Sequence, residues 1–422
     1  MRKWSRREWL RRMLWSGLGL WLAACRGLRP RDGPGEADLS PTLDIPLSLP
    51  STLSPVSSSQ LHEARFYRRL EDHRIQCQLC FRKCIVAPGE TGFCRNKKNI
   101  GGTYYDLVYG RPSALQIDPI EKEPCFHMLP GSSIFGIGTA SCNNRCRHCH
   151  NWHLSQRSVD ELPTYEHTPA EIVRLIRDEG CEGVSFTYNE PTVFYDYMFD
   201  IARLAKEQGL GTIFHTNGSM EAEPLLALLE HMDAVTVDLK ASTPKFYREV
   251  SDSELKPVLR TLENIRKTDV HLEIVNLIIP GYNDDLHHIR AMCRWIREHL
   301  GDEVPLHFTR FFPAYKLNHL PPTPVETLSS AAYTADDEGL KYVYIGNLPG
   351  HERNSTFCPS CGKRLIHRSH FQVFSIALEE GKCPQCGEEI PGIWWEGDRR
   401  ISSTPSAPRL LPPYSPSDYY PY

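Results

Sequence analysis

SCNNRCRHCHNW, residues 141–152, contains three cysteines in the spacing C-x3-C-x2-C. Thiolates this close together, from Cys142, Cys146 and Cys149, can hold three corners of a cubane iron–sulfur cluster. Electron-transfer clusters are held by four cysteines. A cluster with three protein ligands keeps one metal position open for chemistry, as catalytic zinc sites do. The alternative is a zinc knuckle or three unrelated cysteines, and the spacing favours the open cluster.

The residues on either side of this stretch predict an α/β body. SIFGIG, residues 133–138, is short, apolar and glycine-containing, which predicts a strand that enters a loop. From there to residue 348, apolar segments such as 183–188 and 212–216 alternate with amphipathic ones such as 286–300. Such alternation favours parallel strands joined by right-handed crossovers. The choice is between an open doubly wound sheet and a partial or full barrel.

Polar residues gather directly after the predicted strands. Asn189 and Glu190 follow one strand, Asn217 follows the next, and Asp238 and Lys240 end a third. In both architectures the carboxyl ends of parallel strands form the site. The alternative is that these are ordinary turn residues, but their recurrence at consecutive strand ends favours a site.

A cysteine quartet precedes the central triad in the sequence. Its spacing is C-x2-C-x3-C-x9-C, with glycines at 89 and 92 that predict a tight turn before the last cysteine. Four thiolates suffice for a structural zinc ion or for an auxiliary iron–sulfur cluster, and the sequence leaves the metal open. The quartet consists of Cys77, Cys80, Cys84 and Cys94.

A second quartet follows the α/β body as two C-x2-C knuckles, each continuing into glycine. The separation of the knuckles predicts a zinc ribbon in which four thiolates close a tetrahedral structural site. A pair of redox-active C-x-x-C motifs is the alternative. The four residues are Cys358, Cys361, Cys383 and Cys386. Three other cysteines are predicted to pack in the core: Cys125, Cys181 and Cys293.

The N-terminus has the features of an export signal. SRREWLR at 5–11 is a twin-arginine pattern, and an apolar stretch over 13–24, too short to span a bilayer comfortably, leads to a lipobox-like ending at Cys25. We therefore expect a signal over 1–27 and attachment to a membrane outside the cytoplasm. The alternative is a fortuitous pattern in a cytoplasmic protein. Segment 28–60 is Pro- and Ser-rich and predicts a tether, and 399–422 predicts a disordered tail.

Composition suits a large globular enzyme. The chain has 422 residues, 40% of them hydrophobic and 24% charged, so two or three domains with a sizeable core are expected. A net charge of -4 gives no global attraction to nucleic acid or anionic membranes. Lys363, Arg364, His367 and Arg368 form only a modest basic cluster in the ribbon, so there is no strong nucleic-acid signal.

Several segments together resemble a known family. The C-x3-C-x2-C run is similar to that of radical S-adenosylmethionine (SAM) enzymes. Other segments resemble one subgroup, the radical SAM enzyme of the AmmeMemoRadiSam system, which is related to pyruvate formate-lyase-activating enzymes. The likeness covers roughly residues 65–395. The segments are CHNW at 149–152, YNEPT at 188–192, HTNG at 215–218, VDLK at 237–240, IIPGYND at 278–284 and GNLPG at 346–350.

This resemblance implies a partial (β/α)6 radical SAM barrel over 127–349, with an N-terminal cysteine-rich segment at 61–126 and the zinc ribbon at 350–398. It also implies that the central triad holds a 4Fe-4S cluster whose open iron chelates SAM. Glu190 matches the glutamate of the Gly-Gly-Glu motif in relatives, which contacts the SAM amino group. Helix capping is the other role expected for Glu190. The resemblance places three further residues in the SAM pocket: Asn217, Asp238 and Lys240.

The implied reaction is reductive cleavage of SAM to methionine and a 5′-deoxyadenosyl radical, which abstracts hydrogen from an unknown substrate. The implied partners are a reductant such as a flavodoxin or ferredoxin and the proteins of the AmmeMemoRadiSam system. A glycyl-radical enzyme activase is the alternative enzyme. A zinc-ribbon binding module and a pure electron carrier are alternatives of other classes.

Overall fold

The computed structural model describes residues 61–394 and the two-residue strand β18 (Arg409–Leu410). The predicted signal (1–27) and tether (28–60) lie outside the described residues, as does the predicted tail (399–422) apart from β18. Within the described part, no helix combines the length and the apolar character needed to cross a membrane.

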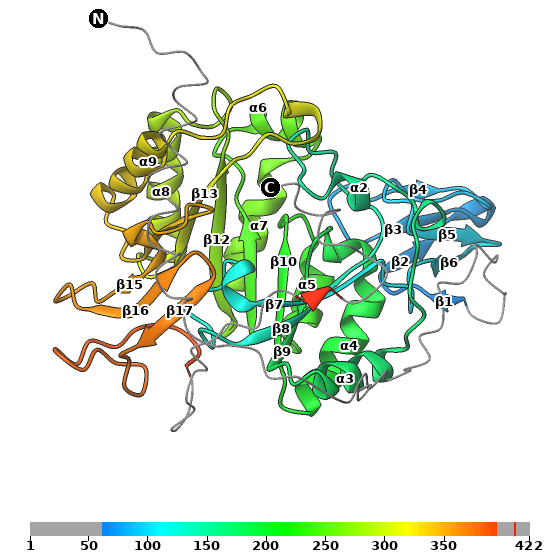
Figure 1. The fold of residues 1–422 in the computed structure, drawn as a ribbon. Helices are drawn as coiled ribbons and strands as arrows, with labels where there is room; N and C mark the ends of the chain where they lie inside the picture. The colour runs from blue at the N-terminus through cyan, green and yellow to red at the C-terminus, as the bar shows by residue number, and fades with distance from the viewer. Residues whose placement is uncertain (1–60, 395–408, 411–422) are drawn as a thin grey trace, which may run out of the picture. The chain divides into compact units, whose positions relative to one another are not determined.

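The body of the described chain is a nine-stranded, mostly parallel sheet (Figure 1) in the order β14-β13-β12-β11-β10-β9-β8-β7-β18. β7 runs antiparallel to β8, while β8 to β14 pair in parallel. The α/β class is confirmed. The described sheet stays open and has seven parallel strands, β8 to β14, one more than the six of the (β/α)6 barrel that the resemblance implies. The strands are β7 (Ala114–Pro119), β8 (Ser133–Gly138), β9 (Gly183–Phe186), β10 (Gly211–Thr216), β11 (Ala234–Asp238), β12 (His271–Ile278), β13 (Leu306–Arg310) and β14 (Val343–Gly346).

Amphipathic helices connect these strands. Thr168 forms a capping box with Glu171 at the start of α3, and Asp285 accepts backbone hydrogen bonds at the start of α8. Each helix buries an apolar stripe, as Ile289, Cys293 and Ile296 do on α8. The helices are α3 (Pro169–Asp178), α4 (Tyr195–Glu207), α5 (Ala222–Leu229), α7 (Leu255–Ile265), α8 (Leu286–Leu300) and α9 (Val325–Asp337).

The N-terminal cysteine-rich segment forms two small antiparallel sheets, in the orders β1-β6-β5 and β2-β3-β4. The sequence analysis did not predict these strands, since they are only two to four residues long and too short for a periodic pattern. They are β1 (His62–Glu63), β2 (Tyr67–Arg69), β3 (Ile75–Cys77), β4 (Ile85–Val86), β5 (Lys97–Ile100) and β6 (Thr103–Asp106).

A buried ion cluster fastens this segment to helix α4. The ammonium of Lys97 lies 2.6 Å from Asp106 and 2.6 Å from Asp196 on α4, and all three side chains are almost completely buried. Arg65 adds a contact of 3.3 Å to Asp196 and one of 2.8 Å to Asp200. The attraction offsets the desolvation of these charges only while every partner is present.

We expect Lys97→Met to destabilise the protein by about 3–5 kcal/mol, because Asp106 would remain buried without a cation and Asp196 would keep only Arg65. Urea unfolding measures the change in the free energy of unfolding. Lys341→Met is the matched control, since Lys341 pairs with Asp302 and Glu303 at a partly exposed site where about 0–1 kcal/mol is expected. Equal losses in the two variants would contradict the stabilising role of the buried cluster.

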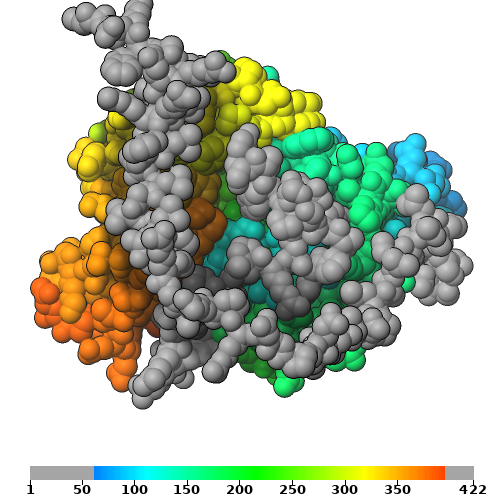
Figure 2. All heavy atoms as spheres, viewed as in Figure 1, coloured from blue at the N-terminus to red at the C-terminus, as the bar shows by residue number. Residues whose placement is uncertain are grey.

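The C-terminal ribbon packs against the β14 edge of the sheet and forms the orange-to-red surface in Figure 2. Cys358 and Leu365 share a core with Tyr342 and Tyr344. Arg368 reaches into the body, where its Nε lies 3.2 Å from Glu121 and its Nη2 donates to Phe126 O at 2.7 Å. The ribbon strands are β15 (Thr356–Phe357), β16 (Arg364–Ser369) and β17 (Gln372–Ile376).

Candidate active site

The three central cysteines lie on the loop that follows the carboxyl end of β8, between Gly138 and the short helix α2 (Trp152–Ser155). Asn189, at the end of β9, holds the start of this loop. Its Oδ1 accepts from Thr139 N at 3.0 Å and its Nδ2 donates to Ser141 O at 2.8 Å. The sequence placed Asn189 near the site but did not reveal this positioning role.

The thiols of the triad do not converge on a single ion. Among the described residues, thiols, imidazoles and carboxylates approach within 4.8 Å of one another in groups of three or more at two places, and neither includes the triad. Asn144 N donates to the Cys142 sulfur at 3.3 Å, and Cys149 lies 3.2 Å from Ser155 Oγ. Thiols that do not form one compact group fit a cluster better than one zinc ion, because each thiolate of a cluster binds a different iron.

Glu190 and Asn217 lie together at the ends of β9 and β10. Glu190 Oε1 accepts from Thr192 N at 3.1 Å, Thr192 Oγ1 at 2.6 Å and Thr216 Oγ1 at 2.8 Å. Its Oε2 accepts from Asn217 N at 2.7 Å and keeps a second lone pair. Glu190 therefore caps the 3-10 helix η5 (Pro191–Phe194), as the alternative interpretation expected, while one acceptor position is left over.

The Asn217 amide faces the triad loop. Its Nδ2 donates to Asn143 Oδ1 at 2.8 Å, and Asn143 directly follows Cys142. Burial raises the pKa of Cys142, and the nearby Glu190 carboxylate raises it further. Glu190 and Asn217 thus flank the Cys142 side of the triad.

Asp238 and Lys240 flank the Cys146 side. Lys240 Nζ lies 2.7 Å from Asp238 Oδ2, and His215 Nε2 lies 3.2 Å from Asp238 Oδ1. Burial lowers the pKa of His215, but Asp238 and Glu123 outweigh burial and raise that pKa to about 10. Burial raises the pKa of Cys146, and Lys240 opposes this rise. The sequence analysis did not single out His215 by itself, although it lies in the HTNG segment.

Tyr188 begins the sequence Tyr-Asn-Glu at 188–190, which aligns with the Gly-Gly-Glu motif through Glu190. Its φ of 69° is in the left-handed region that glycine favours, so the backbone keeps a glycine-like conformation here. Its ring fills the space where a side chain at Gly136 or Gly138 would lie. Its hydroxyl donates to Asp118 at 2.8 Å and its carbonyl accepts from Asn151 at 2.8 Å. The two glycines of β8 thus make room for an aromatic ring against the sheet.

His148, which directly precedes Cys149, is buried with its ring 6.1 Å from that of Phe246. Burial lowers the pKa of His148 to about 3, so the imidazole is neutral.

The C-terminal quartet does converge. Its four sulfurs lie within 4.8 Å of one another, with Cys358 and Cys386 3.6 Å apart and Cys361 and Cys383 3.6 Å apart. A tetrahedral ion with metal–sulfur bonds of zinc length separates its ligands by about 3.8 Å. The predicted four-thiol site is therefore present, with the size of a mononuclear centre.

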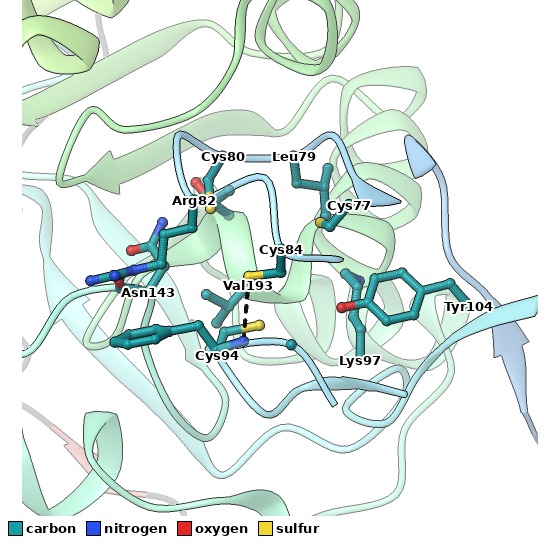
Figure 3. Close-up of a pocket in the computed structure, with 13 residues that line it drawn as sticks. Cys77, Leu79, Cys80, Arg82, Cys84, Cys94, Lys97, Tyr104, Asn143 and Val193 are labelled. Atoms are coloured by element: carbon teal, nitrogen blue, oxygen red, sulfur yellow. Dashed lines mark hydrogen bonds between the residues drawn. The ribbon is translucent and has the colours of Figure 1, made fainter. Parts of the chain in front are cut away.

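The N-terminal quartet lines one cavity next to the triad loop (Figure 3). In contrast to the C-terminal quartet, no three of its sulfurs lie within 4.8 Å of one another in the described structure.

A further polar cluster escaped the sequence analysis. Cys125, expected to pack in the core, is fully buried there, but its sulfur lies within 4.8 Å of His271 and Glu273. Glu273 also contacts His307 at 2.5 Å and accepts from His127 N at 2.7 Å. These residues come from distant parts of the chain, so no local pattern signals their meeting. They join the amino end of β12 to the segment that precedes β8.

Comparison with known proteins identifies the α/β body. The profile of the Radical SAM superfamily matches residues 137–296. An uncharacterized protein of Methanocaldococcus jannaschii, MJ0808, is 45% identical over 332 residues, which cover 78% of this chain and 99% of that protein. The pyruvate formate-lyase-activating enzyme of Clostridium pasteurianum is 26% identical over 167 residues, 37% of this chain and 66% of the relative. The GTP 3',8-cyclase of Aquifex aeolicus is 28% identical over 188 residues, 43% of this chain and 56% of the relative.

Members of this superfamily are enzymes that use a 4Fe-4S cluster and SAM. The matched region includes the triad, the flanking polar residues at the ends of β9 to β11, and most of the parallel strands. A binding module or an electron carrier therefore does not describe the whole protein. The chain is an enzyme that belongs to the radical SAM superfamily.

Proposed function

We propose that this protein reductively cleaves SAM at a 4Fe-4S cluster held by Cys142, Cys146 and Cys149, and that it uses the resulting radical on a substrate held at the strand ends. The observation that carries the proposal is the loop at the carboxyl end of β8, whose three thiols do not form a compact group around one ion. Formation of 5′-deoxyadenosine by the anaerobic, reduced protein tests it.

The chain's own residues would bind and orient SAM. When bound and reduced, the cluster supplies the electron that breaks a carbon–sulfur bond of SAM. Glu190 Oε2 would accept a hydrogen bond from the SAM ammonium through its remaining lone pair. Asp238 and Lys240 present one negative and one positive group beside Cys146 for the polar ends of the cofactor. Asn217 holds the Cys142 side of the loop through Asn143.

Glu190→Gln should lower SAM affinity by about tenfold to a hundredfold, because a charge-assisted hydrogen bond contributes roughly 1.5–3 kcal/mol. The cluster should assemble normally, since Glu190 is not among its ligands. Spectroscopic titration of SAM against the cluster measures the affinity. Glu171→Gln is the matched control, because it removes an acidic capping group from α3, on the exposed surface. Unchanged SAM affinity with lower thermal stability would leave Glu190 as a cap alone.

A glycyl-radical activase is the second candidate. The similarity to the activating enzyme of Clostridium pasteurianum supports it. An activase would generate a glycyl radical in a partner protein, which electron paramagnetic resonance (EPR) detects directly. The motif resemblance to the AmmeMemoRadiSam enzyme supports instead a reaction that involves the proteins of that system. A flavodoxin or ferredoxin would serve as reductant in either case.

Two further assignments belong to this proposal. The C-terminal quartet would hold a structural zinc ion, supported by sulfur pairs 3.6 Å apart. The twin-arginine and lipobox patterns support export and membrane attachment. A reporter fused after residue 27 tests export, and membrane fractionation tests the attachment.

A further inference from the structure

The N-terminal quartet surrounds a cavity that lies beside the central loop. Cys77 ends β3, Cys80 and Cys84 belong to the turn that follows, and Cys94 precedes β5. In Figure 3 the four cysteines line the same space, together with Leu79 and Val193. The four thiols form one site, because β3 and two turns place all of them around the same cavity.

The spacing of the thiols distinguishes the kind of metal centre. The C-terminal quartet provides an internal standard, since its sulfurs all lie within 4.8 Å of one another, as a single tetrahedral ion requires. Within residues 61–394, the N-terminal sulfurs form no such group of three. Thiolates that each bind a separate iron of a cluster must stand farther apart than thiolates around one ion. Four thiols around one cavity that do not close on a single ion therefore favour a polynuclear centre.

We propose that Cys77, Cys80, Cys84 and Cys94 hold a second 4Fe-4S cluster that delivers the electron for SAM cleavage to the central cluster. This role rests on the proposed function of the central site. An external low-potential reductant would donate one electron to the N-terminal cluster. That cluster returns to its oxidised state as the central cluster gains the electron, so one electron enters and one is consumed per SAM cleaved.

Asn143 connects the two sites. It directly follows Cys142 and also lines the N-terminal cavity. Its side chain lines that cavity together with Cys80, and its Oδ1 lies 3.9 Å from the Cys142 sulfur. One side chain therefore lies beside both groups of cysteines. The rate of electron transfer falls steeply with distance. Two metal centres with a single side chain between them are therefore close enough for a relay.

The wall between the sites is also well packed. The Arg82 guanidinium lies 3.4 Å from the centre of the Phe93 ring, and that of Arg145 lies 4.2 Å from the same ring. Phe93 N points to the Cys84 sulfur at 3.5 Å, and Arg145 Nη1 donates to Cys142 O at 2.7 Å. Hydrogen bonds to sulfur and nearby charge tune cluster potentials. This wall thus contacts both centres and ties the positions of their ligands together.

Metal analysis of the full chain with Cys142, Cys146 and Cys149 replaced by alanine tests the cluster. After anaerobic reconstitution the variant should retain about four irons and four sulfides, and the wild type about eight of each. A variant that holds a second zinc ion, or no iron, would overturn the proposal whether or not the wild type cleaves SAM. If the variant holds iron but the wild type does not cleave SAM, the proposed function of the central site is refuted, and the relay is refuted with it.

EPR tests the relay. The reduced triad variant gives the spectrum of the N-terminal cluster alone, and SAM should leave that signal unchanged. When the wild type is reduced by about one electron per protein, addition of SAM should make the signal of the N-terminal cluster decay. One spin should be lost for each molecule of 5′-deoxyadenosine formed. If the N-terminal signal persists while 5′-deoxyadenosine accumulates, the relay is wrong.

Discussion

Replacement of Cys142, Cys146 and Cys149 by alanine should abolish the formation of 5′-deoxyadenosine from SAM. Each of these thiols would bind one iron, and the described structure brings no further cysteine, histidine or carboxylate group into a compact site with them. Without the cluster, no group in the loop can pass an electron to the SAM sulfonium. Product should fall to the level of a protein-free reaction, as measured by chromatography after anaerobic reduction with dithionite.

Cys181→Ala is the matched control for this experiment. Cys181 is a buried core cysteine of the same domain that precedes the amino end of β9, whereas the triad follows the carboxyl end of β8. It should cost some stability through the small cavity it leaves and retain SAM cleavage. If the triad variant still forms 5′-deoxyadenosine after reduction, the catalytic site has been assigned to the wrong residues.

Cys361→Ala should remove the metal from the C-terminal quartet and unfold the ribbon before it affects chemistry at the strand ends. Structural zinc contributes apparent binding free energies of about 10–16 kcal/mol in small zinc-binding peptides, and there the binding is coupled to folding. The ribbon shares its small core with Phe126, Tyr342 and Tyr344 of the body, so its fold depends on this contribution. Zinc content and limited proteolysis of the full chain measure the effect.

Ser360→Ala provides the control within the same knuckle. Its hydroxyl donates to Glu388 at 2.7 Å on the exposed surface, and its loss should leave zinc bound and the ribbon resistant to protease. Zinc retained in full by the Cys361 variant would contradict the structural role. Iron in place of zinc at this quartet would contradict the choice of metal while keeping the four-thiol site.

The parts of the fold with long, regular patterns were predictable from the sequence. The predicted helix at 286–300 matches α8, and the predicted alternation gives the parallel order from β8 to β14. The six short strands of the N-terminal segment and the antiparallel β7 were not predicted. Strands of two to four residues carry no measurable period, and their pairing is fixed by tertiary contacts such as those of Lys97 with Asp106 and Asp196.

The candidate site was predictable where its residues are close in sequence. Spacing alone identified the triad and both quartets, and the strand-end rule brought Glu190, Asn217, Asp238 and Lys240 to the triad. Contacts between distant residues were not predictable, since no local pattern encodes them. Such contacts include the hydrogen bonds of Asn189 to the triad loop and the hydrogen bond from Asn217 to Asn143.

The most direct test of the central claim is product analysis of the wild-type protein after anaerobic reconstitution, reduction with dithionite and addition of SAM. The account predicts 5′-deoxyadenosine and methionine in equal amounts, with none formed when dithionite is left out. Fully reconstituted, reduced protein that leaves SAM intact would contradict it.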